Sequence, residues 1–335
     1  MPSNLLETNR FGLYCKEGDF YIDPWEAVPR ALITHAHSDH AHPNCGSYLT
    51  STAGEPLLRE RVANNASIES LPYLEKIRIK GCTVTFYPAG HILGSSQIKV
   101  SKEGYSAVFS GDYKRENDGS CEAFEPVSCQ EFITESTFAL PVYQWEHPLK
   151  VFAEIADWCN QNILKNCTSV LFAYALGKAQ RLLKGLENCD FPIAVHGSVM
   201  RFIPHYLQAG VLKKKPLLGN KDNLSKIKGR GLLIAPISTL GSPWLKKFAP
   251  FSLAGASGWM QLRGNRRRKG FDRGFVLSDH ADWKDILQTV KETGASKIGA
   301  THGFTDPLVQ YLNEKDYQAY SLKTNFRSEE TASEF

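Results

Sequence analysis

The sequence predicts an α/β protein in which one metal-binding domain is interrupted by an inserted domain. Three observations lead to this prediction. Short strands separated by turns predominate before about residue 145, strands alternate with helices after it, and side chains of metal-ligand type occur near both ends of the chain. Alternating strands and helices are typical of a parallel sheet covered by helices. A chain of 335 residues is long enough for two such domains.

The first part of the chain is rich in short strands. Two apolar runs flank the turn sequence K-E-G-D, and this pattern predicts a hairpin. The apolar run before T-H-A-H-S-D-H predicts a buried strand at 31–34. A helix is expected at 56–64, and further strands are expected at 84–87, 97–100, 107–109 and 132–134.

After about residue 145 the pattern changes to longer helices between buried strands. Apolar side chains recur at helical spacing from Phe152 to Ile163, and strands are expected at 170–173, 193–195 and 232–235. From about residue 270 we expect a strand closed by S-D-H-A-D-W, a helix at 283–293, a strand at 298–301 and a last helix capped by Asp306. We therefore assign 1–145 and 271–335 to a split metal domain and 146–270 to the inserted domain.

The run T-H-A-H-S-D-H carries the strongest chemical signal in the chain. It places four metal-ligand side chains within six residues, namely His35, His37, Asp39 and His40. Alternation along the extended chain directs His35 and His37 to one side, while Asp39 and His40 come from the turn. Imidazole suits zinc and similar ions, and a carboxylate can bridge or hold a second ion. The alternative, a polar turn that is rich in histidine by chance, accounts poorly for this spacing.

Four further candidate ligands are expected where strands end. His91, Asp112, His280 and His302 each follow or close a predicted strand, and glycines stand beside three of them. Each alone is as well explained by a turn, but together with the first run they supply two sets of about four ligands. Asp112, a carboxylate, can bridge two ions, and such a pair lowers the pKa of a bound water towards neutrality. The pattern predicts a two-metal hydrolase.

These motifs resemble those of the β-CASP nucleases, a nucleic-acid-processing branch of the metallo-β-lactamase superfamily. The matched segments are Y-I-D-P with Asp23, T-H-A-H-S-D-H, His91, S-G-D, T-E-S-T with Glu135, S-D-H-A-D-W and T-H-G-F-T-D. The resemblance implies a metallo-β-lactamase αββα sandwich with an inserted β-CASP α/β domain. The chain length and F-Y-I-D-P-W-E resemble the bacterial ligase-associated DNA exonucleases, which implies a DNA ligase and a helicase as partners.

The resemblance also implies a role for each matched residue. One ion would be held by His35, His37, His91 and Asp112, and the other by Asp39, His40, Asp112 and His302. Asp23 would support the ligands from behind. Glu135 would pair with His280, which would protonate the leaving oxygen, so the expected catalytic residues are Asp39, Glu135 and His280. A carboxylate beside a histidine suits it to general acid catalysis.

Outside the metal set, three segments suggest contacts to nucleic acid. Tyr174 can stack on a base, and Lys178 at a helix start can hold a phosphate, although a solvated lysine explains it nearly as well. His196 and Ser198 offer a similar site, but Ser198 can equally be a helix cap. Arg266 and Arg267 belong to a basic run that can guide a phosphate backbone or simply form a charged loop.

Composition sets broad limits. The net charge of +4 permits a polyanionic substrate without requiring one. The eight cysteines include no C-x-x-C pair, the N-terminus has no secretory signal, and no apolar run is long enough to span a membrane. These features favour a cytoplasmic protein with reduced thiols and no membrane partner.

The leading hypothesis is a nuclease with two divalent ions, zinc or else manganese, that degrades single-stranded DNA from its ends during DNA repair. His302 favours an alternative within the same fold, an RNA-processing endo- or exoribonuclease, because RNA-processing members of the family usually carry histidine there. A third possibility is a metallo-hydrolase of small molecules, which the histidine run alone allows. Glu135, His280 and the inserted domain favour the nuclease hypotheses.

Overall fold

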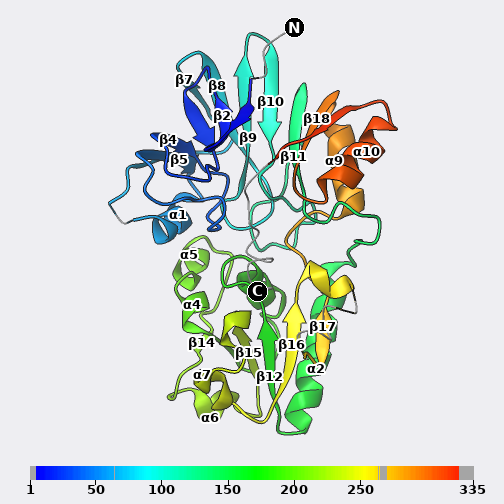
Figure 1. The fold of residues 1–335 in the computed structure, drawn as a ribbon. Coiled ribbons are helices and arrows are strands. Elements are labelled where there is room, and N and C mark those ends of the chain that lie inside the picture. The colour runs from blue at the N-terminus through cyan, green and yellow to red at the C-terminus, as the bar shows by residue number, and fades with distance from the viewer. Residues whose placement is uncertain (1–4, 64, 263, 265–269, 324–335) are drawn as a thin grey trace. The chain divides into compact units, whose positions relative to one another are not determined.

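The computed structural model describes residues 5–63, 65–262, 264 and 270–323. The chain divides into two compact units. Unit 1 consists of Met1–Asn117, Cys121–Tyr143 and His280–Phe335, and unit 2 consists of Asp118–Ser120 and Gln144–Asp279. Both units are mixed α/β structures, as the alternation of strands and helices predicts (Figure 1).

Unit 1 contains two sheets. The first has the strand order β1-β2-β3-β4-β5-β6, with antiparallel pairing from β1 to β3 and parallel pairing from β3 to β6. The predicted K-E-G-D hairpin joins β2 and β3. The strands are β1 (Glu7–Asn9), β2 (Gly12–Cys15), β3 (Phe20–Ile22), β4 (Arg30–Leu32), β5 (Ser47–Ser51) and β6 (Ile68–Leu71).

The second sheet of unit 1 has the order β19-β18-β11-β10-β9-β8-β7. Its late strands β18 and β19 pair in parallel beside β11, so segments far apart in the sequence become neighbours. The strands are β7 (Lys76–Ile79), β8 (Cys82–Pro88), β9 (Ser96–Lys102), β10 (Tyr105–Phe109), β11 (Glu131–Ser136), β18 (Lys297–Gly303) and β19 (Gln318–Ser321).

The two sheets of unit 1 pack face to face and carry helices on their outer faces. One apolar core joins Phe20 and Leu32 of the first sheet with Phe86 and Ile133 of the second. The outer face of the first sheet packs on α1 (Glu55–Arg61). The outer face of the second packs on α9 (Trp283–Thr293) and α10 (Thr305–Asn313). Helix, sheet, sheet and helix therefore form successive layers, which hold the strand ends rigidly.

Unit 2 is built on a parallel sheet of order β14-β13-β15-β12-β16-β17. Its strands are β12 (Thr168–Phe172), β13 (Ile193–Val195), β14 (Leu217–Leu218), β15 (Leu232–Ala235), β16 (Phe251–Ala256) and β17 (Arg273–Phe275). Its helices are α2 (Pro148–Leu164), α3 (Lys178–Gly185), α4 (Gly197–Met200), α5 (Ile203–Gln208), α6 (Leu224–Ile227) and α7 (Pro243–Lys246), with 3-10 turns at Ile237–Thr239 and Gly258–Gln261.

Two local predictions differ from the structure. Residues 271–279, which the sequence pattern assigns to the metal domain, lie in unit 2 because β17 pairs with β16 there. The last helix begins at Thr305, so Asp306 lies inside its first turn and is not the cap. The position of Asp306 near the helix start does not show from the sequence alone whether it precedes the helix or lies in its first turn.

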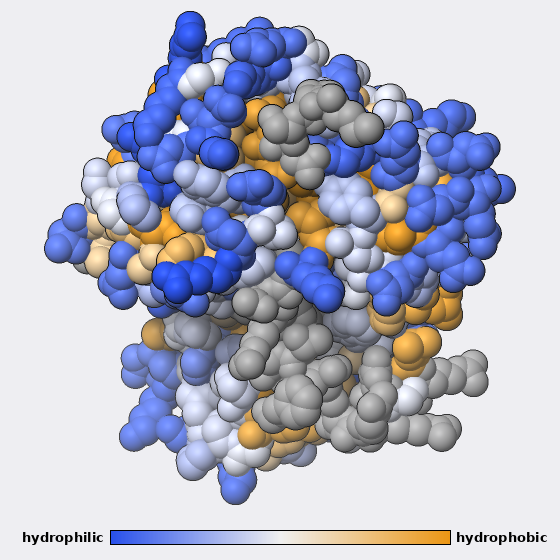
Figure 2. Space-filling model, turned by 45° about the horizontal axis from the view of Figure 1, so that its top comes forward, coloured by the Kyte–Doolittle hydropathy of each residue, from blue (hydrophilic) through white to orange (hydrophobic). Residues whose placement is uncertain are grey.

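The surface is largely polar. On the face drawn in Figure 2, hydrophilic side chains predominate and apolar ones occur in patches between them. Among the described residues, no helix combines the length and apolar character needed to cross a bilayer.

Candidate metal centre

The histidine run follows β4 and is fixed by backbone hydrogen bonds on both sides. The carbonyl of Thr34 accepts a bond from the N–H of Ser96 at 2.9 Å, which ties the chain to the second sheet. The carbonyl of His37 then accepts bonds from the N–H groups of His40 and Ala41, at 3.2 and 2.9 Å. This turn reverses the chain so that both His35 and His40 come within 4 Å of Asp112, at 3.7 and 3.5 Å.

The remaining candidate ligands come from the ends of other strands of unit 1. His91 follows β8, Asp112 follows β10, and His302 lies near the end of β18 with a φ of +60°. Glycine is required beside Asp112, because Gly111 has a φ of +55° and a Cβ there would lie 2.8 Å from the Thr34 side chain. The close approach of these two loops places Asp112 beside the histidine run.

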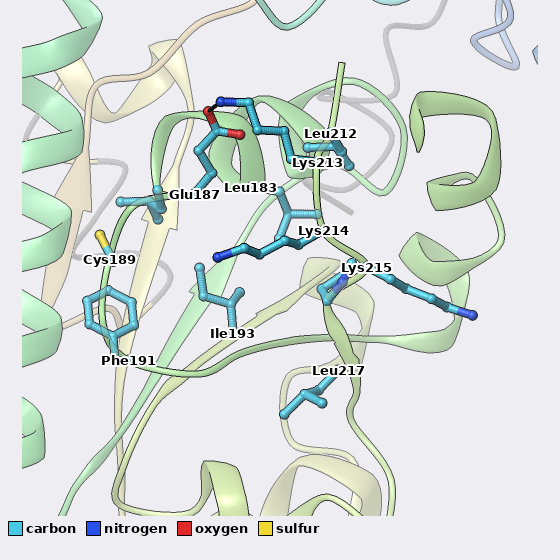
Figure 3. Close-up of a pocket in the computed structure, with 12 residues that line it drawn as sticks. Leu183, Glu187, Cys189, Phe191, Ile193, Leu212, Lys213, Lys214, Lys215 and Leu217 are labelled. Carbon is cyan, nitrogen blue, oxygen red and sulfur yellow. Dashed lines mark ion pairs between the residues drawn. The ribbon is translucent and has the colours of Figure 1, made fainter. Parts of the chain in front are cut away.

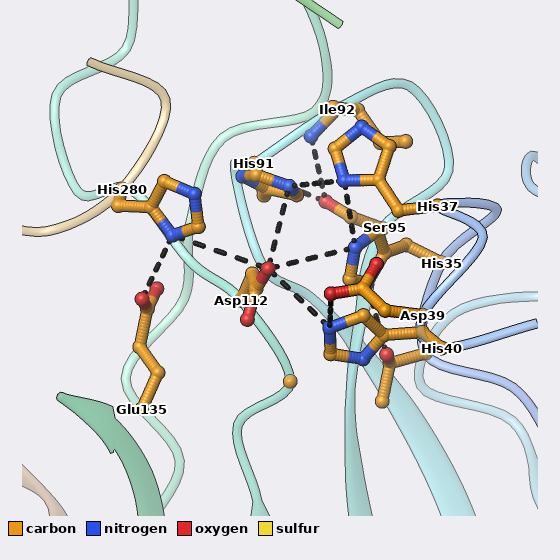
Figure 4. Close-up of polar contacts among 12 residues, drawn as sticks. His35, His37, Asp39, His40, His91, Ile92, Ser95, Asp112, Glu135 and His280 are labelled. Carbon is orange, nitrogen blue, oxygen red and sulfur yellow. Dashed lines mark hydrogen bonds and ion pairs between the residues drawn. The ribbon is translucent and has the colours of Figure 1, made fainter. Parts of the chain in front are cut away.

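One group of four ligands forms a compact cluster around His37. Its Nδ1 lies 3.1 Å from Nε2 of His35 and 3.2 Å from Nε2 of His91. Both of these Nε2 atoms lie within 4 Å of Oδ2 of Asp112, at 3.7 and 3.8 Å (Figure 4). All four residues are buried, and one ligand atom from each lies within 4.8 Å of the others.

A second group lies on the other side of the same carboxylate. Asp39, His40 and His302 form a cluster in which Oδ2 of Asp39 lies 3.8 Å from Nε2 of His40 and 3.7 Å from Nε2 of His302. The rings of His40 and His302 are stacked, with centroids 5.2 Å apart. Nε2 of His40 is also 3.5 Å from Oδ2 of Asp112. Asp112 therefore faces both groups, as a bridging ligand must.

Asp23 supports this arrangement from behind. It is fully buried, and its carboxylate accepts bonds from the Thr34 N–H at 2.8 Å and the Thr34 hydroxyl at 2.5 Å. The same carboxylate contacts Nδ1 of His40 at 2.8 Å. Nδ1 of His40 therefore donates to Asp23, while Nε2 lies 3.5 Å from Oδ2 of Asp112. Partners of this kind fix the ring orientation of metal-binding histidines.

The donor set of these clusters fits divalent cations. Every converging atom is an imidazole nitrogen or a carboxylate oxygen, and Oδ1 of Asp112 is buried without a hydrogen-bond partner among the described residues. Burial, together with the positive charge of His40, holds the pKa of His35 well below its ordinary value. Burial opposes ionisation of Asp112, but the neighbouring His40 and His280 hold the pKa of its carboxyl well below the usual range. An ionised aspartate beside a histidine that burial keeps neutral offers the lone pairs that a metal requires.

Beside the clusters, Glu135 and His280 form the ion pair that the resemblance implies. Oε2 of Glu135 lies 2.8 Å from Nδ1 of His280, which in turn lies 4.0 Å from Oδ2 of Asp112. The Glu135 carboxylate also accepts bonds from the Tyr113 N–H and the Thr137 hydroxyl, at 2.7 and 2.6 Å. These three bonds fix the carboxylate and the Nδ1 side of the His280 ring.

Three supporting groups were not found from the sequence. They are the hydroxyl of Thr34, the hydroxyl of Thr137 and the backbone N–H of Tyr113. The two threonines stand next to matched motifs, in T-H-A-H and T-E-S-T, and this proximity was the available signal. The Tyr113 N–H has no signature in a sequence, because every residue except proline has one.

The substrate residues predicted in unit 2 lie in different surroundings. Tyr174 and His196 follow the carboxyl ends of β12 and β13, where ligands of open α/β sheets bind. His196 itself caps α4, since its Nδ1 accepts a bond from the Ser198 N–H at 3.2 Å, so Ser198 is not the cap. Burial lowers the pKa of His196. The structure brings these three residues to one end of the sheet.

Lys178 differs from its prediction as a phosphate ligand. Its side chain is 1% exposed, and its ammonium lies 3.2 Å from Oδ1 of Asp279. A lysine that is buried in an ion pair cannot present its charge to a phosphate without breaking that pair. The helix start that suggested a solvated lysine does not reveal that the side chain turns inward. Arg266 and Arg267 lie outside the described residues.

Unit 2 also carries a pocket that holds none of the predicted site residues. It has a volume of about 260 Å³, and its floor contains Leu183, Phe191 and Ile193 (Figure 3). Lys213 and Lys214 stand at its wall, and Lys213 is held by Glu187 at 3.5 Å. The pocket lies by the amino-terminal ends of β13 and β14, at the opposite end of the sheet from Tyr174 and His196.

Comparisons with known proteins agree with the motifs. A scan against models of protein families finds no match. A probable DNA ligase of Opitutus terrae is 29% identical over 313 residues, which are 93% of this chain and 30% of that protein. The cleavage and polyadenylation specificity factor subunit 3 of Dictyostelium discoideum is 29% identical over 44% of this chain and 18% of its own length. An endoribonuclease, ysh1, of Schizosaccharomyces pombe is 33% identical over 36% of this chain and 16% of its own length.

The chain thus spans less than a third of the length of these curated relatives. Among solved structures, a protein of unknown function from Enterococcus faecalis superimposes with a TM-score of 0.60 at 12% identity, over 89% of this chain and 80% of the other. That likeness concerns the fold alone.

The layered fold and the converging side chains define an α/β protein with clusters that could hold metal ions. The relatives confirm the more particular resemblance that the motifs predicted. The chain resembles the β-CASP nuclease branch of the metallo-β-lactamase superfamily, and these relatives support that resemblance.

Proposed function

We propose that this protein is a two-metal phosphodiesterase that cleaves single-stranded nucleic acid. The observation that carries the proposal is the single buried carboxylate, Asp112, placed between two groups of ligands and beside the Glu135–His280 pair. The proposed fold is the metallo-β-lactamase αββα sandwich with an inserted β-CASP domain. The successive layers of unit 1 and the resemblance to the relatives support it.

The proposed ligands follow the two groups. His35, His37, His91 and Asp112 would hold one ion, and Asp39, His40, Asp112 and His302 the other. A set that is rich in imidazole favours zinc, and the carboxylates also admit manganese. When bound, such a pair supplies Lewis acidity at the phosphate and lowers the pKa of a coordinated water.

The proposed role of His280 is to protonate the leaving oxygen. Its Nδ1 is engaged by Glu135, so the proton is delivered from Nε2. Glu135 is buried and fixed by the Tyr113 N–H and the Thr137 hydroxyl, so it holds the ring in one orientation and stabilises its protonated form. Asp39 is fixed between His40 and His302, which together hold the pKa of its carboxyl at about 2 against the effect of burial. It is therefore ionised at any working pH.

The substrate that we favour is DNA, degraded from its ends. The support is the relative named a probable DNA ligase, in which the matched region covers 93% of this chain but only 30% of that protein. A region joined to a ligase in one protein is a candidate partner of a ligase in another, so we propose a DNA ligase, with a helicase, as partners in repair. Tyr174, His196 and Ser198, and outside the described residues Arg266 and Arg267, are the proposed substrate contacts.

RNA is the second candidate substrate. Several relatives are named endoribonucleases. His302 belongs to the second ligand group here, and RNA-processing members of the family usually carry histidine at this position. The two candidates differ in the sugar that the strand carries, so matched oligonucleotides distinguish them.

The test is a cleavage time course on 5′-labelled and 3′-labelled single-stranded DNA and RNA of one sequence, with zinc or manganese, resolved by gel. We expect mononucleotides to be released stepwise from one end of the DNA. Cleavage restricted to RNA would replace the DNA proposal with the RNA one. If the metal-loaded protein leaves both strands intact, the nuclease proposal is wrong.

A further inference from the structure

Helix α3 carries two buried cations that the proposed reaction does not use. Lys178 and Arg181 lie three residues apart on one face of the helix and are 0% and 1% exposed. Removing an ammonium and a guanidinium from water is costly unless each finds charged and hydrogen-bonding partners. Neither residue is part of the apolar core of unit 2, which is formed by other side chains. Their burial is therefore best understood from the groups that they hold.

Both cations hold chain segments that have no regular secondary structure. The Lys178 ammonium lies 3.2 Å from Oδ1 of Asp279. The Arg181 guanidinium donates to the backbone carbonyl of Ser278 at 2.9 Å, and its Nε lies 2.9 Å from Oδ2 of Asp118. The same Nε donates to the Ser120 hydroxyl at 3.2 Å. Two neighbouring residues, Ser278 and Asp279, are thus bound by two cations on one face of one helix.

Ser278 and Asp279 lie immediately before His280 in the chain. The strand β17 ends at Phe275 and α9 begins at Trp283, so the segment between them has no regular secondary structure, although the Ala281 N–H donates to the Tyr113 carbonyl at 2.7 Å. Nδ1 of His280 must remain 2.8 Å from Glu135 if its Nε2 is to be aimed at a substrate. A displacement of 1 Å in a reacting group can cost about a hundredfold in rate. The geometry of this irregular segment therefore bears directly on proton delivery.

We propose that Lys178 and Arg181 are positioning residues for His280, acting along the chain through Asp279 and Ser278. The proposal deepens the proposed function, since it assumes that His280 is the proton donor. The guanidinium fixes a backbone carbonyl and the ammonium fixes the adjacent carboxylate, so the segment is held at two points. Contacts at both Ser278 and Asp279 fix the direction of the chain before His280, whereas a contact at one of them alone would leave that direction free to vary.

The alternative is that the buried pairs only stabilise unit 2. The two roles make different predictions for a folded variant. A merely structural pair changes the unfolding temperature and leaves the turnover of the folded fraction intact. A positioning pair lowers kcat of the folded protein, leaves KM and metal content unchanged, and loosens the backbone at 276–282.

The test compares Lys178→Met with Lys184→Met, a matched change on the same helix. Lys184 is 21% exposed and pairs with Glu187 at 3.2 Å, outside the bound segments. For Lys178→Met we expect kcat on labelled single-stranded DNA to fall about tenfold to a hundredfold. We also expect faster hydrogen exchange at 276–282, measured on the metal-loaded protein by mass spectrometry. Lys184→Met should change neither quantity.

A third variant keeps the test decisive if Lys178→Met does not fold. Lys178→Arg retains the charge and alters the reach, so it should fold, with a smaller loss of kcat and partial retention of protection at 276–282. The proposal is overturned if a folded Lys178 variant keeps the wild-type kcat, or if exchange at 276–282 is unchanged. If the wild-type protein cleaves no nucleic acid, the proposed function has failed, and the exchange measurement still decides whether α3 fixes this segment.

Discussion

The two groups of buried polar side chains in this protein differ in whether their charges are balanced within the chain. Around Asp112 in unit 1, the converging atoms are nitrogens and oxygens that offer lone pairs, and they share a need for added positive charge. Around α3 in unit 2, Lys178 and Arg181 already supply that charge to Asp279 and Asp118. The first group is suited to receive an ion, while the second is complete within the chain. Burial of charged side chains alone therefore does not indicate a ligand site. Convergence of several nitrogen and oxygen atoms that can each donate a lone pair to a metal does indicate one.

The largest effect is expected when Asp112, the residue shared by both ligand groups of unit 1, is replaced. Asp112→Ala removes the oxygen that faces both ligand groups, so both ions should bind weakly and cleavage of labelled DNA should fall to background. Asp23→Ala is the graded control, because it removes the supporting bonds to His40 and Thr34 but no proposed ligand, and it should cost about 10–100-fold in metal affinity. Retention of two ions and of activity by Asp112→Ala would contradict the assignment of the bridging ligand.

The next effect separates proton delivery from metal binding. His280→Ala should lower kcat by about 10²–10⁴-fold, because the leaving oxygen loses its general acid. Metal content should stay at the wild-type value, since His280 contacts Asp112 only at 4.0 Å. Glu135→Gln should show a smaller loss of the same kind, as it keeps the shape of the partner without its charge. Turnover and metal content are measured on the same preparations, and loss of metal in His280→Ala would make His280 a ligand instead.

In the second group, the expected effect is on stability. Arg181→Met leaves the Asp118 carboxylate buried without its guanidinium, and loss of one partner of a buried pair costs about 3–5 kcal/mol. The free energy of unfolding from urea titration measures this cost. Metal content of the protein that remains folded should equal that of wild type. A loss below about 1 kcal/mol would mean that the pair contributes little to unit 2.

The smallest expected effect concerns the Asp285 carboxylate, for which burial outweighs the neighbouring Arg115 at 4.0 Å. Burial, and then the neighbouring Asp282, raise the pKa of Asp285 to about 6 from an ordinary 3.8. A raised carboxyl pKa favours the protonated form in the folded state, so stability is present at low pH and is lost as the pH rises from about 4 to 6. Asp285→Asn should therefore be about 1–2 kcal/mol more stable than wild type at pH 7, after allowance for the lost helix-dipole interaction. Thermal unfolding at about pH 7 and about pH 4.5 tests this, and an advantage that grows towards low pH would refute it.

The difference between the two groups also determines how far each could be predicted from the sequence. Residues 35–40 crowd four side chains of ligand type into one turn, so their convergence in unit 1 was predictable from the sequence, while metal binding by them stays a prediction. The strands β13 and β15 and the helix α9 were likewise predictable, because buried runs and helical periodicity are local properties. Lys178 and Arg181 look like a solvated helix face, since their partners lie far away in the sequence. The edge strand β14 was missed for a related reason, as only its pairing with β13 defines it.

The measurement that tests the central claim most directly is a calorimetric titration of the metal-free protein with zinc, followed by elemental analysis of the product. We predict two ions per wild-type chain and a marked loss of both in Asp112→Ala, with His280→Ala retaining two. A chain that binds no ion, or an Asp112→Ala variant that still binds two, would contradict the claim that one carboxylate unites two metal sites.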